Sequence, residues 1–155
     1  MGNVGDKILK HHLTADKVPG TEDISTIAWS GDRGLTLVEM GPFGVIGAIT
    51  PATNPSETVI CNCIGMLAGG NTVVFNPHPN AKKTTIYTIN MINEASIEAG
   101  GPDNIAVTVE APTLDTSAIM MKHPSIHLLV ATGGPGVVTA VLSSGKRAIG
   151  AGAGN

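Results

Sequence analysis

The sequence predicts an α/β fold: a parallel sheet with helices on both faces, preceded by a β-hairpin segment. Short apolar runs alternate with longer segments of helical periodicity, which is the pattern of βαβ units. Glycine accounts for 20 of the 155 residues and gathers at the edges of the apolar runs, where tight strand–helix turns are needed. Hydrophobic content of 42% with 14% charged residues suits a soluble α/β domain.

Each element has its own signal. Residues 1–25 are polar and are expected to be irregular, and 27–38 reads as strand, tight turn and strand. Paired glycines mark the expected ends of two helices. The chain then divides into an N-terminal hairpin segment, 1–42, and a larger domain, 43–155. In that domain the expected strands are 45–50, 72–75, 105–109, 126–131 and 147–150, and the expected helices are 55–68, 81–99, 115–122 and 136–143.

The stretch Asn54-Pro55-Ser56-Glu57 resembles a helix start. Asparagine is a good N-cap, proline suits the first helical position, and Glu57 stands where a capping box places its acid. The residues alone leave open whether Asn54 is only a cap or also faces a substrate.

Unusual residues collect at the predicted carboxyl ends of the strands, where open parallel sheets bind ligands. After the strand that ends at Ala131, Gly133-Gly134 could let backbone N–H groups approach a pyrophosphate, or could serve a turn that needs positive φ. Asn76-Pro77-His78-Pro79 is likewise either a ligand-facing loop or a rigid turn. On motif strength alone, the turn is the favoured interpretation of both segments.

Several function classes are not supported. Net charge is −3 and no basic run is longer than Lys82-Lys83, so no nucleic-acid partner is expected. No apolar stretch suggests a membrane span or a signal peptide, which predicts a cytoplasmic protein. Histidine spacing predicts no metal site. Cys61 and Cys63 are expected to be buried small thiols within a helix, so neither is a convincing nucleophile.

Five segments taken in order resemble the aldehyde dehydrogenase superfamily. They are GPFGVIGAITPATNP, AGGNTVVFNPHP, EAGGPDNIAVTVE, HPSIHLLVATGGPGVV and KRAIGAGAGN. The likeness is to the CoA-acylating branch, in particular the propionaldehyde and acetaldehyde dehydrogenases of bacterial propanediol- and ethanolamine-utilisation microcompartments. It implies a Rossmann-like sheet, an NAD cofactor and coenzyme A as co-substrate.

The resemblance also implies site residues. Asn54 matches the family asparagine whose side-chain amide stabilises the oxyanion of a thiohemiacetal, a role compatible with capping. The residues implied to bind the cofactor are Thr50, Pro51, Ala52, Asn76, His78, Pro79, Gly133, Gly134 and Val137.

Two departures from hydrolytic members favour transfer to a thiol. Asn76 stands where those enzymes have a lysine that holds the adenosine ribose, and Ala151 stands where they have the glutamate that activates the deacylating water. Without that base, attack by the thiol of CoA on the acyl-enzyme is favoured over attack by water.

The catalytic cysteine of this family lies beyond the position of Asn155, so the chain is expected to be a fragment, truncated before the catalytic domain. Strands resembling an oligomerisation hairpin predict a homo-oligomer, and the resemblance extends to association with a bacterial microcompartment. The alternatives are a non-catalytic NAD- or CoA-binding or assembly fragment, or a piece of a hydrolytic aldehyde dehydrogenase.

Overall fold

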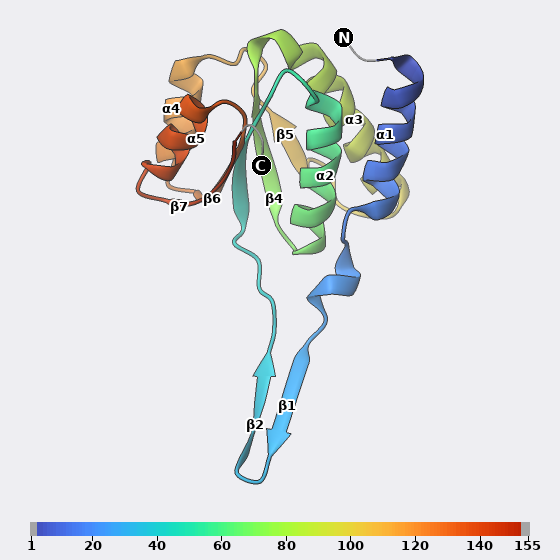
Figure 1. The fold of residues 1–155 in the computed structure, drawn as a ribbon, viewed down its shortest axis with the longest axis vertical. Coiled ribbons are helices and arrows are strands. Elements are labelled where there is room, and N and C mark those ends of the chain that lie inside the picture. Colours follow the sequence, from blue (N-terminus) through green and yellow to red (C-terminus); the bar gives the residue numbers. More distant parts are fainter. Residues whose placement is uncertain (1–2, 153–155) are drawn as a thin grey trace.

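The computed structural model describes residues 3–152. Among these residues no helix combines the length and the apolar character needed to cross a bilayer. In chain order the elements are α1 (Val4–Lys17), the 3-10 turn η1 (Thr21–Ile24), β1 (Ile27–Gly31), β2 (Gly34–Val38), β3 (Val45–Thr50), α2 (Pro55–Ala68), β4 (Thr72–Pro77), the 3-10 turn η2 (Pro79–Ala81), α3 (Lys82–Glu98), β5 (Ala106–Thr108), α4 (Leu114–Lys122), β6 (Ile126–Thr132), α5 (Pro135–Leu142) and β7 (Arg147–Ala151) (Figure 1).

Five strands form a parallel sheet in the order β5-β4-β3-β6-β7. The chain enters the sheet at its centre with β3, builds outward through β4 and β5, and then returns to place β6 on the other side of β3. The strand order therefore reverses between β3 and β6, and open α/β sheets bind ligands outside such a switch point. The predicted Rossmann-like parallel sheet is confirmed.

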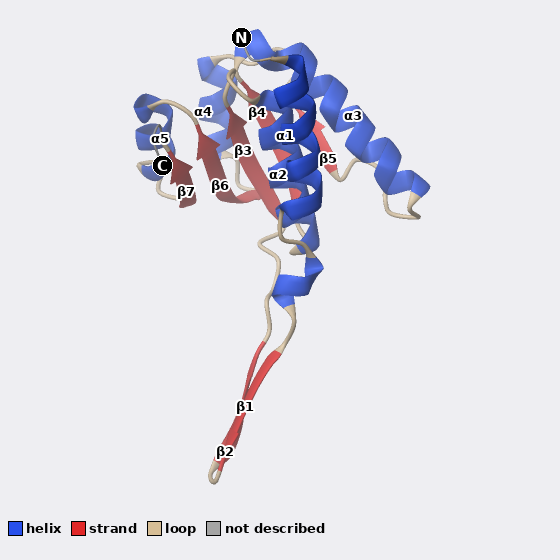
Figure 2. Cartoon of the chain, turned by 45° about the vertical axis from the view of Figure 1, so that its right-hand side comes forward, coloured by secondary structure: helices blue, strands red, loops and turns tan. Residues whose placement is uncertain are grey.

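Helices cover both faces of this sheet, with α2 and α3 on one side, α4 and α5 on the other, and α1 alongside α2 (Figures 1 and 2). Each face has its own hydrophobic core, because successive side chains of a strand point to opposite faces. The core beneath α2 and α3 contains Ala48, Val59, Cys63, Val73, Phe75, Ile89 and Ala106. The core beneath α4 and α5 contains Met120, Ile126, Leu129, Ala131 and Val141.

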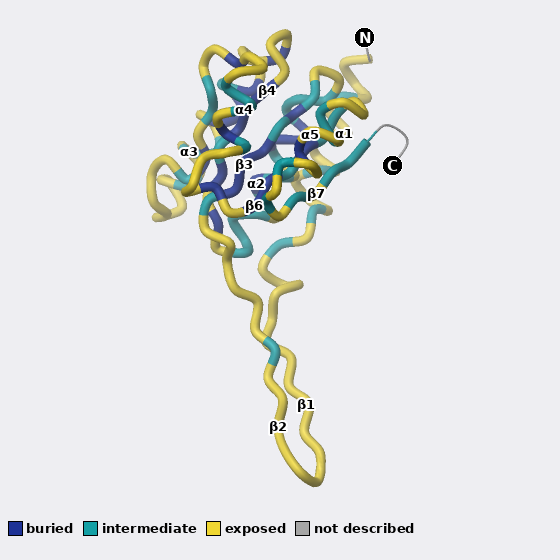
Figure 3. The backbone as a smooth tube through the Cα atoms, turned by 90° about the vertical axis from the view of Figure 1, so that its left-hand side faces the viewer, coloured by how far each residue is buried: buried dark blue, intermediate teal, exposed yellow. Residues whose placement is uncertain are grey.

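Strands β1 and β2 form an antiparallel hairpin that extends away from the sheet (Figure 3). Its register pairs Ile27 with Val38 and Gly31 with Gly34, as the predicted tight turn requires. Every residue of the two strands is exposed except the half-buried Val38. An isolated two-stranded hairpin is only marginally stable in water, and Trp29 and Leu37, which the register places on opposite faces of the hairpin, are both exposed.

The expectation that residues 1–25 are irregular is wrong, because most of them form α1 and η1. The sequence does carry signals for α1, because Asn3 is its N-cap and the pairs Val4/Ile8 and Leu9/Leu13 have helical spacing. The side turned towards α2 carries Lys7 and His11, whereas Ile8 and Leu13 are exposed. The apolar side of α1 therefore faces away from α2, which the spacing of its residues does not show.

Candidate functional site

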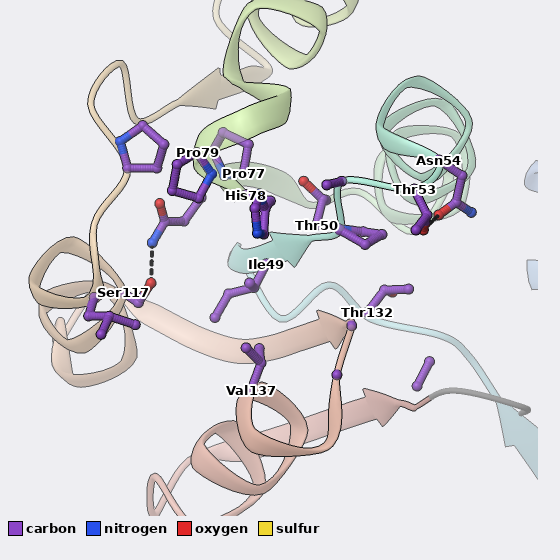
Figure 4. Close-up of a pocket in the computed structure, with 18 of the residues that line it drawn as sticks. Ile49, Thr50, Thr53, Asn54, Pro77, His78, Pro79, Ser117, Thr132 and Val137 are labelled. Atoms are coloured by element: carbon purple, nitrogen blue, oxygen red, sulfur yellow. Dashed lines mark hydrogen bonds between the residues drawn. The ribbon is translucent and has the colours of Figure 1, made fainter. Parts of the chain in front are cut away.

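A cavity of about 830 Å³ opens at the carboxyl ends of the parallel strands, across the switch point between β3 and β6 (Figure 4). The segments after β3, β4, β5 and β6 and the end of β7 contribute to its wall. The structure brings all the predicted site residues together on this wall: Thr50, Pro51, Ala52, Asn54, Asn76, His78, Pro79, Gly133, Gly134 and Val137.

Thr50 is the last residue of β3, and the parallel register sets it beside Pro77, the last residue of β4. The residue is only 2% exposed, and its hydroxyl has no hydrogen-bond partner within the described structure. A buried hydroxyl without a partner costs about 1–3 kcal/mol. Thr50 lines the cavity, but its hydroxyl oxygen is shielded from solvent, so a ligand reaches it only if binding exposes it.

Asn76 is buried at the end of β4, and its side chain is held by α4. Its amide nitrogen donates to the Ser117 hydroxyl at 2.6 Å, and its amide oxygen accepts from the Thr116 hydroxyl at 3.5 Å. Sequence reasoning missed both partners, because they lie on a helix forty residues away in the chain. The signal that existed was topological: α4 follows the strand beside β4, so its first turn lies at the same edge of the sheet.

His78 lies on the exposed rim of the cavity, between the two prolines that follow β4 (Figure 4). Its Nδ1 accepts from the backbone N–H of Asn80 at 3.2 Å and caps the short η2 turn. Because an accepting Nδ1 leaves the proton of a neutral imidazole on Nε2, that nitrogen is a donor available to a ligand.

Asn54 is the N-cap residue of α2, but its side chain makes no capping hydrogen bond. Its amide oxygen instead accepts from the Thr53 hydroxyl at 3.0 Å. The predicted capping box is therefore wrong, because Glu57 is recruited by Lys7 of α1, with 2.8 Å between the lysine nitrogen and the carboxylate. With the amide oxygen occupied, the amide nitrogen of Asn54 is the group free to donate to a ligand.

Glu57 is a buried carboxylate in the first turn of α2, only 4% exposed. Burial acts to raise the pKa of Glu57. Hydrogen bonds from Lys7, from its own backbone N–H and from Ser56, together with the charge of Lys7, outweigh burial and lower the pKa to about 2. The folded chain thus holds a charged carboxylate where a helix N-terminus also favours negative charge.

This lowered pKa makes stability depend on acidity. A carboxylate whose pKa falls on folding stabilises the fold above its unfolded pKa, and that contribution is lost as pH drops from about 4.5 towards 2. We expect Glu57→Gln to flatten the acid limb of a plot of thermal unfolding midpoint against pH. Glu98→Gln, an exposed position at the end of α3, is the control and should leave that limb steep. An acid limb that is equally steep in both variants would contradict the assignment.

Neither backbone angle nor packing requires glycine at positions 133 and 134, in the turn after β6. Gly134, the N-cap of α5, has φ −68°, and Gly133 is not among the glycines with positive φ. The alternative of a turn that needs positive φ is therefore wrong. A Cβ added at Gly133 or Gly134 would meet no atom within 4 Å. The turn leaves open space beside the cavity, where backbone N–H groups of a helix start could meet a phosphate.

Neither cysteine is suited to nucleophilic catalysis at this site. Cys63 is buried as expected, and burial raises the pKa of its thiol to about 12. Cys61 is exposed, which corrects the expectation that both are buried. The two thiols lie on α2, and neither contributes to the cavity wall.

The cavity wall is almost free of charge. Of its described lining residues, His78 is the single one with an ionisable side chain, and the rest offer amides, hydroxyls, prolines and small apolar groups. Within residues 3–152, no three His, Cys, Asp or Glu side chains gather to hold a metal ion. Such a wall suits a ligand bound through backbone N–H groups, hydroxyls and flat apolar contacts, as nucleotides are.

Comparison with known proteins identifies the class. The aldehyde dehydrogenase family profile matches residues 6–151, nearly the whole chain. The chain therefore belongs to the aldehyde dehydrogenase family.

Particular members are strongly similar. The propanal dehydrogenase (CoA-propanoylating) of Salmonella typhimurium is 50% identical over 155 residues, which cover 100% of this chain and 33% of that protein. The propionaldehyde dehydrogenase from the Clostridium phytofermentans fucose utilisation bacterial microcompartment is 77% identical, with a TM-score of 0.96, and the match covers 100% of this chain and 36% of that one.

A second solved relative was determined with a ligand. The Rhodopseudomonas palustris propionaldehyde dehydrogenase with bound propionyl-CoA is 57% identical, with a TM-score of 0.95, and the match covers 100% of this chain and 34% of that one. This chain spans about a third of the length of the curated propanal and acetaldehyde dehydrogenases that it matches.

Proposed function

We propose that this chain is the nucleotide-binding part of an NAD-dependent, CoA-acylating aldehyde dehydrogenase. The reaction converts propionaldehyde or another short aldehyde, NAD⁺ and CoA into acyl-CoA and NADH. The observation that carries the proposal is the glycine turn. Neither Gly133 nor Gly134 has a positive φ, and an added Cβ would meet no neighbouring atom, so the fold does not require glycine there. Both residues nevertheless border the cavity. Family membership and the acylating relatives support the same reading.

The residues present fit a dinucleotide. The backbone N–H of Gly134, at the start of α5, is the donor offered to the pyrophosphate, because the N–H of Gly133 already donates to the Ala151 carbonyl oxygen at 3.1 Å. The Thr50 hydroxyl, shielded in the free chain, gains a partner once binding exposes it. His78 and Pro79 form the rim on the β4 side. NAD⁺, when bound, accepts the hydride that leaves the substrate carbon, so that an acyl thioester remains on the enzyme.

Within this chain Asn54 is the group that acts on the reacting atoms. When a cysteine thiolate from the rest of the enzyme adds to the aldehyde carbonyl, the oxygen becomes negative, and the free amide nitrogen of Asn54 donates to it. Ala151 lies on the cavity wall without a carboxylate to activate water. The thiolate of CoA then attacks the thioester, forms acyl-CoA and releases the cysteine thiolate.

The assembly proposal concerns the first 42 residues. We infer that the β1–β2 hairpin joins a second copy of the same enzyme, since Trp29 and Leu37, on its two faces, are left exposed by residues 3–152. The enzyme would then be a homo-oligomer. A cytoplasmic bacterial protein, enclosed within a microcompartment, agrees with the described source of the Clostridium phytofermentans relative.

A chimera tests the proposed function. Residues 1–155 would replace the matching segment of the Clostridium phytofermentans enzyme, which is 77% identical. With propionaldehyde, NAD⁺ and CoA, we expect the chimera to produce NADH and propionyl-CoA, with little propionate. The 155-residue chain by itself should produce no NADH, because it lacks a suitable thiol.

Three outcomes would contradict the proposal. A correctly folded chimera without activity would reject the assignment of this chain to such an enzyme. Propionate as the main product would favour a hydrolytic enzyme and reject the role given to Ala151. NADH formation by the isolated chain would show that a nucleophile within it had been overlooked.

A further inference from the structure

We propose that Lys7 and His11 of α1 are positioning residues that hold the loop carrying Asn54 in its catalytic orientation. The inference rests on the proposed function, because it takes Asn54 as the oxyanion donor. It adds a role for α1, a helix that contributes nothing to the cavity wall.

The evidence begins with a chain of hydrogen bonds from α1 to the first turn of α2. Lys7 Nζ lies 2.8 Å from Glu57 Oε1, and the Ser56 hydroxyl donates to Glu57 Oε2 at 3.1 Å. His11 Nε2 lies 2.7 Å from Ser56 Oγ. His11 Nδ1 lies 2.7 Å from the carbonyl oxygen of Lys7, and it must be the donor because a carbonyl only accepts. Lys10 Nζ also lies 3.8 Å from Glu57 Oε1, so three side chains of α1 contact two consecutive residues of α2.

The same contacts reach Asn54 from two sides. Lys7 Nζ lies 3.5 Å from the carbonyl oxygen of Thr53, the residue immediately before Asn54. The Thr53 hydroxyl donates to the Asn54 side-chain oxygen, and the Thr58 hydroxyl donates to the Asn54 backbone oxygen at 2.8 Å. Because Asn54 makes no capping bond of its own, these neighbours define where its amide nitrogen points.

Stability alone does not account for this arrangement. The pair does contribute to stability, because the pKa of Glu57 falls on folding, but it is not a fully buried ion pair: the Lys7 side chain is 37% exposed. An apolar contact between α1 and α2 would have been a simpler way to pack the helices, and α1 has the side chains for it. Ile8 and Leu13 are instead 55% and 50% exposed. The inward face of α1 is specialised for holding Glu57 and Ser56 in a fixed geometry.

The first test needs no activity. In the 155-residue chain, the side-chain amide resonances of Asn54 can be assigned by their loss in Asn54→Ala. We expect Lys7→Met to shift or broaden these resonances and Lys7→Arg to restore them. Lys17→Met, the same change on the same helix near its far end, should leave them unmoved. Unmoved Asn54 resonances in a folded Lys7→Met chain would overturn the proposal.

The second test is kinetic and uses the chimera. Lys7→Met should lower kcat about tenfold, the scale expected for a displaced catalytic group. The KM for NAD⁺ should stay within about twofold, because transition-state stabilisation and not cofactor binding is affected. In a chimera that already carries Asn54→Ala, Lys7→Met should cost nothing more, since it acts only through Asn54.

The outcomes separate the two proposals. If Lys7→Met lowers kcat equally with or without Asn54, α1 acts by general support of the fold and the positioning role is rejected. If the Asn54 resonances respond to Lys7→Met but the unmodified chimera has no acylating activity, the positioning of Asn54 stands and the proposed function fails.

Discussion

Replacing Asn54 with alanine in the chimera is expected to lower kcat for acyl-CoA formation about 10²–10³-fold, the loss seen when one oxyanion donor is removed. The amide nitrogen of Asn54 is the donor concerned, because the amide oxygen is already bonded to the Thr53 hydroxyl. The affinity for NAD⁺ should change little, since the contact forms with the reacting oxygen. Steady-state kinetics with propionaldehyde and a calorimetric titration of NAD⁺ measure the two effects.

The matching stability measurement decides between a cap and a catalyst. Loss of a working N-cap costs about 1 kcal/mol. Thr113, which caps α4 through a reciprocal capping box with Thr116, is the positive control, and Thr113→Ala should show that loss in urea unfolding of the 155-residue chain. Asn54→Ala should cost less than half as much. A full capping loss with unchanged kcat would make Asn54 a structural residue only.

Replacing Thr50 with valine is expected to move binding and stability in opposite directions. Valine keeps the shape and removes the hydroxyl that lacks a partner in the free chain. Unfolding free energy should therefore rise by about 1 kcal/mol. Affinity of the chimera for NAD⁺ should fall by up to about tenfold, the equivalent of one lost hydrogen bond.

Thr85→Val provides the matched control for Thr50→Val. Thr85 on α3 also has a buried hydroxyl without a partner in the described structure, but it does not line the cavity. We expect the same gain in stability and unchanged affinity for NAD⁺. Equal effects of both variants on affinity would show that Thr50 does not contact the cofactor.

The sheet domain could be predicted closely because its signals are local. The predicted bounds of β3 and α2 agree with the structure, since Pro55 starts the helix and Gly69-Gly70 ends it. The edge of the sheet that carries the site followed from the parallel topology alone, because equivalent strand ends meet there. Differences elsewhere are of one or two residues at element ends.

What could not be predicted depends on contacts distant in sequence. Glu57 suggested a capping box, but a lysine fifty residues earlier offers a charged partner, and a local pattern cannot show that competition. The position of Asn76 at a strand end was likewise predictable, but the Ser117 hydroxyl that accepts from its amide was not. The orientation of α1, with its polar side towards α2, likewise depends on contacts distant in sequence.

The open space at Gly133 predicts different effects of a substitution there on folding and on turnover. Because alanine there meets no neighbouring atom and needs no unusual backbone angle, a library sorted for folding would retain it. Sorting the same library for turnover would remove it once the extra methyl group excludes the dinucleotide. If the proposed dinucleotide site is right, we expect folding and turnover to impose separate selection at Gly133.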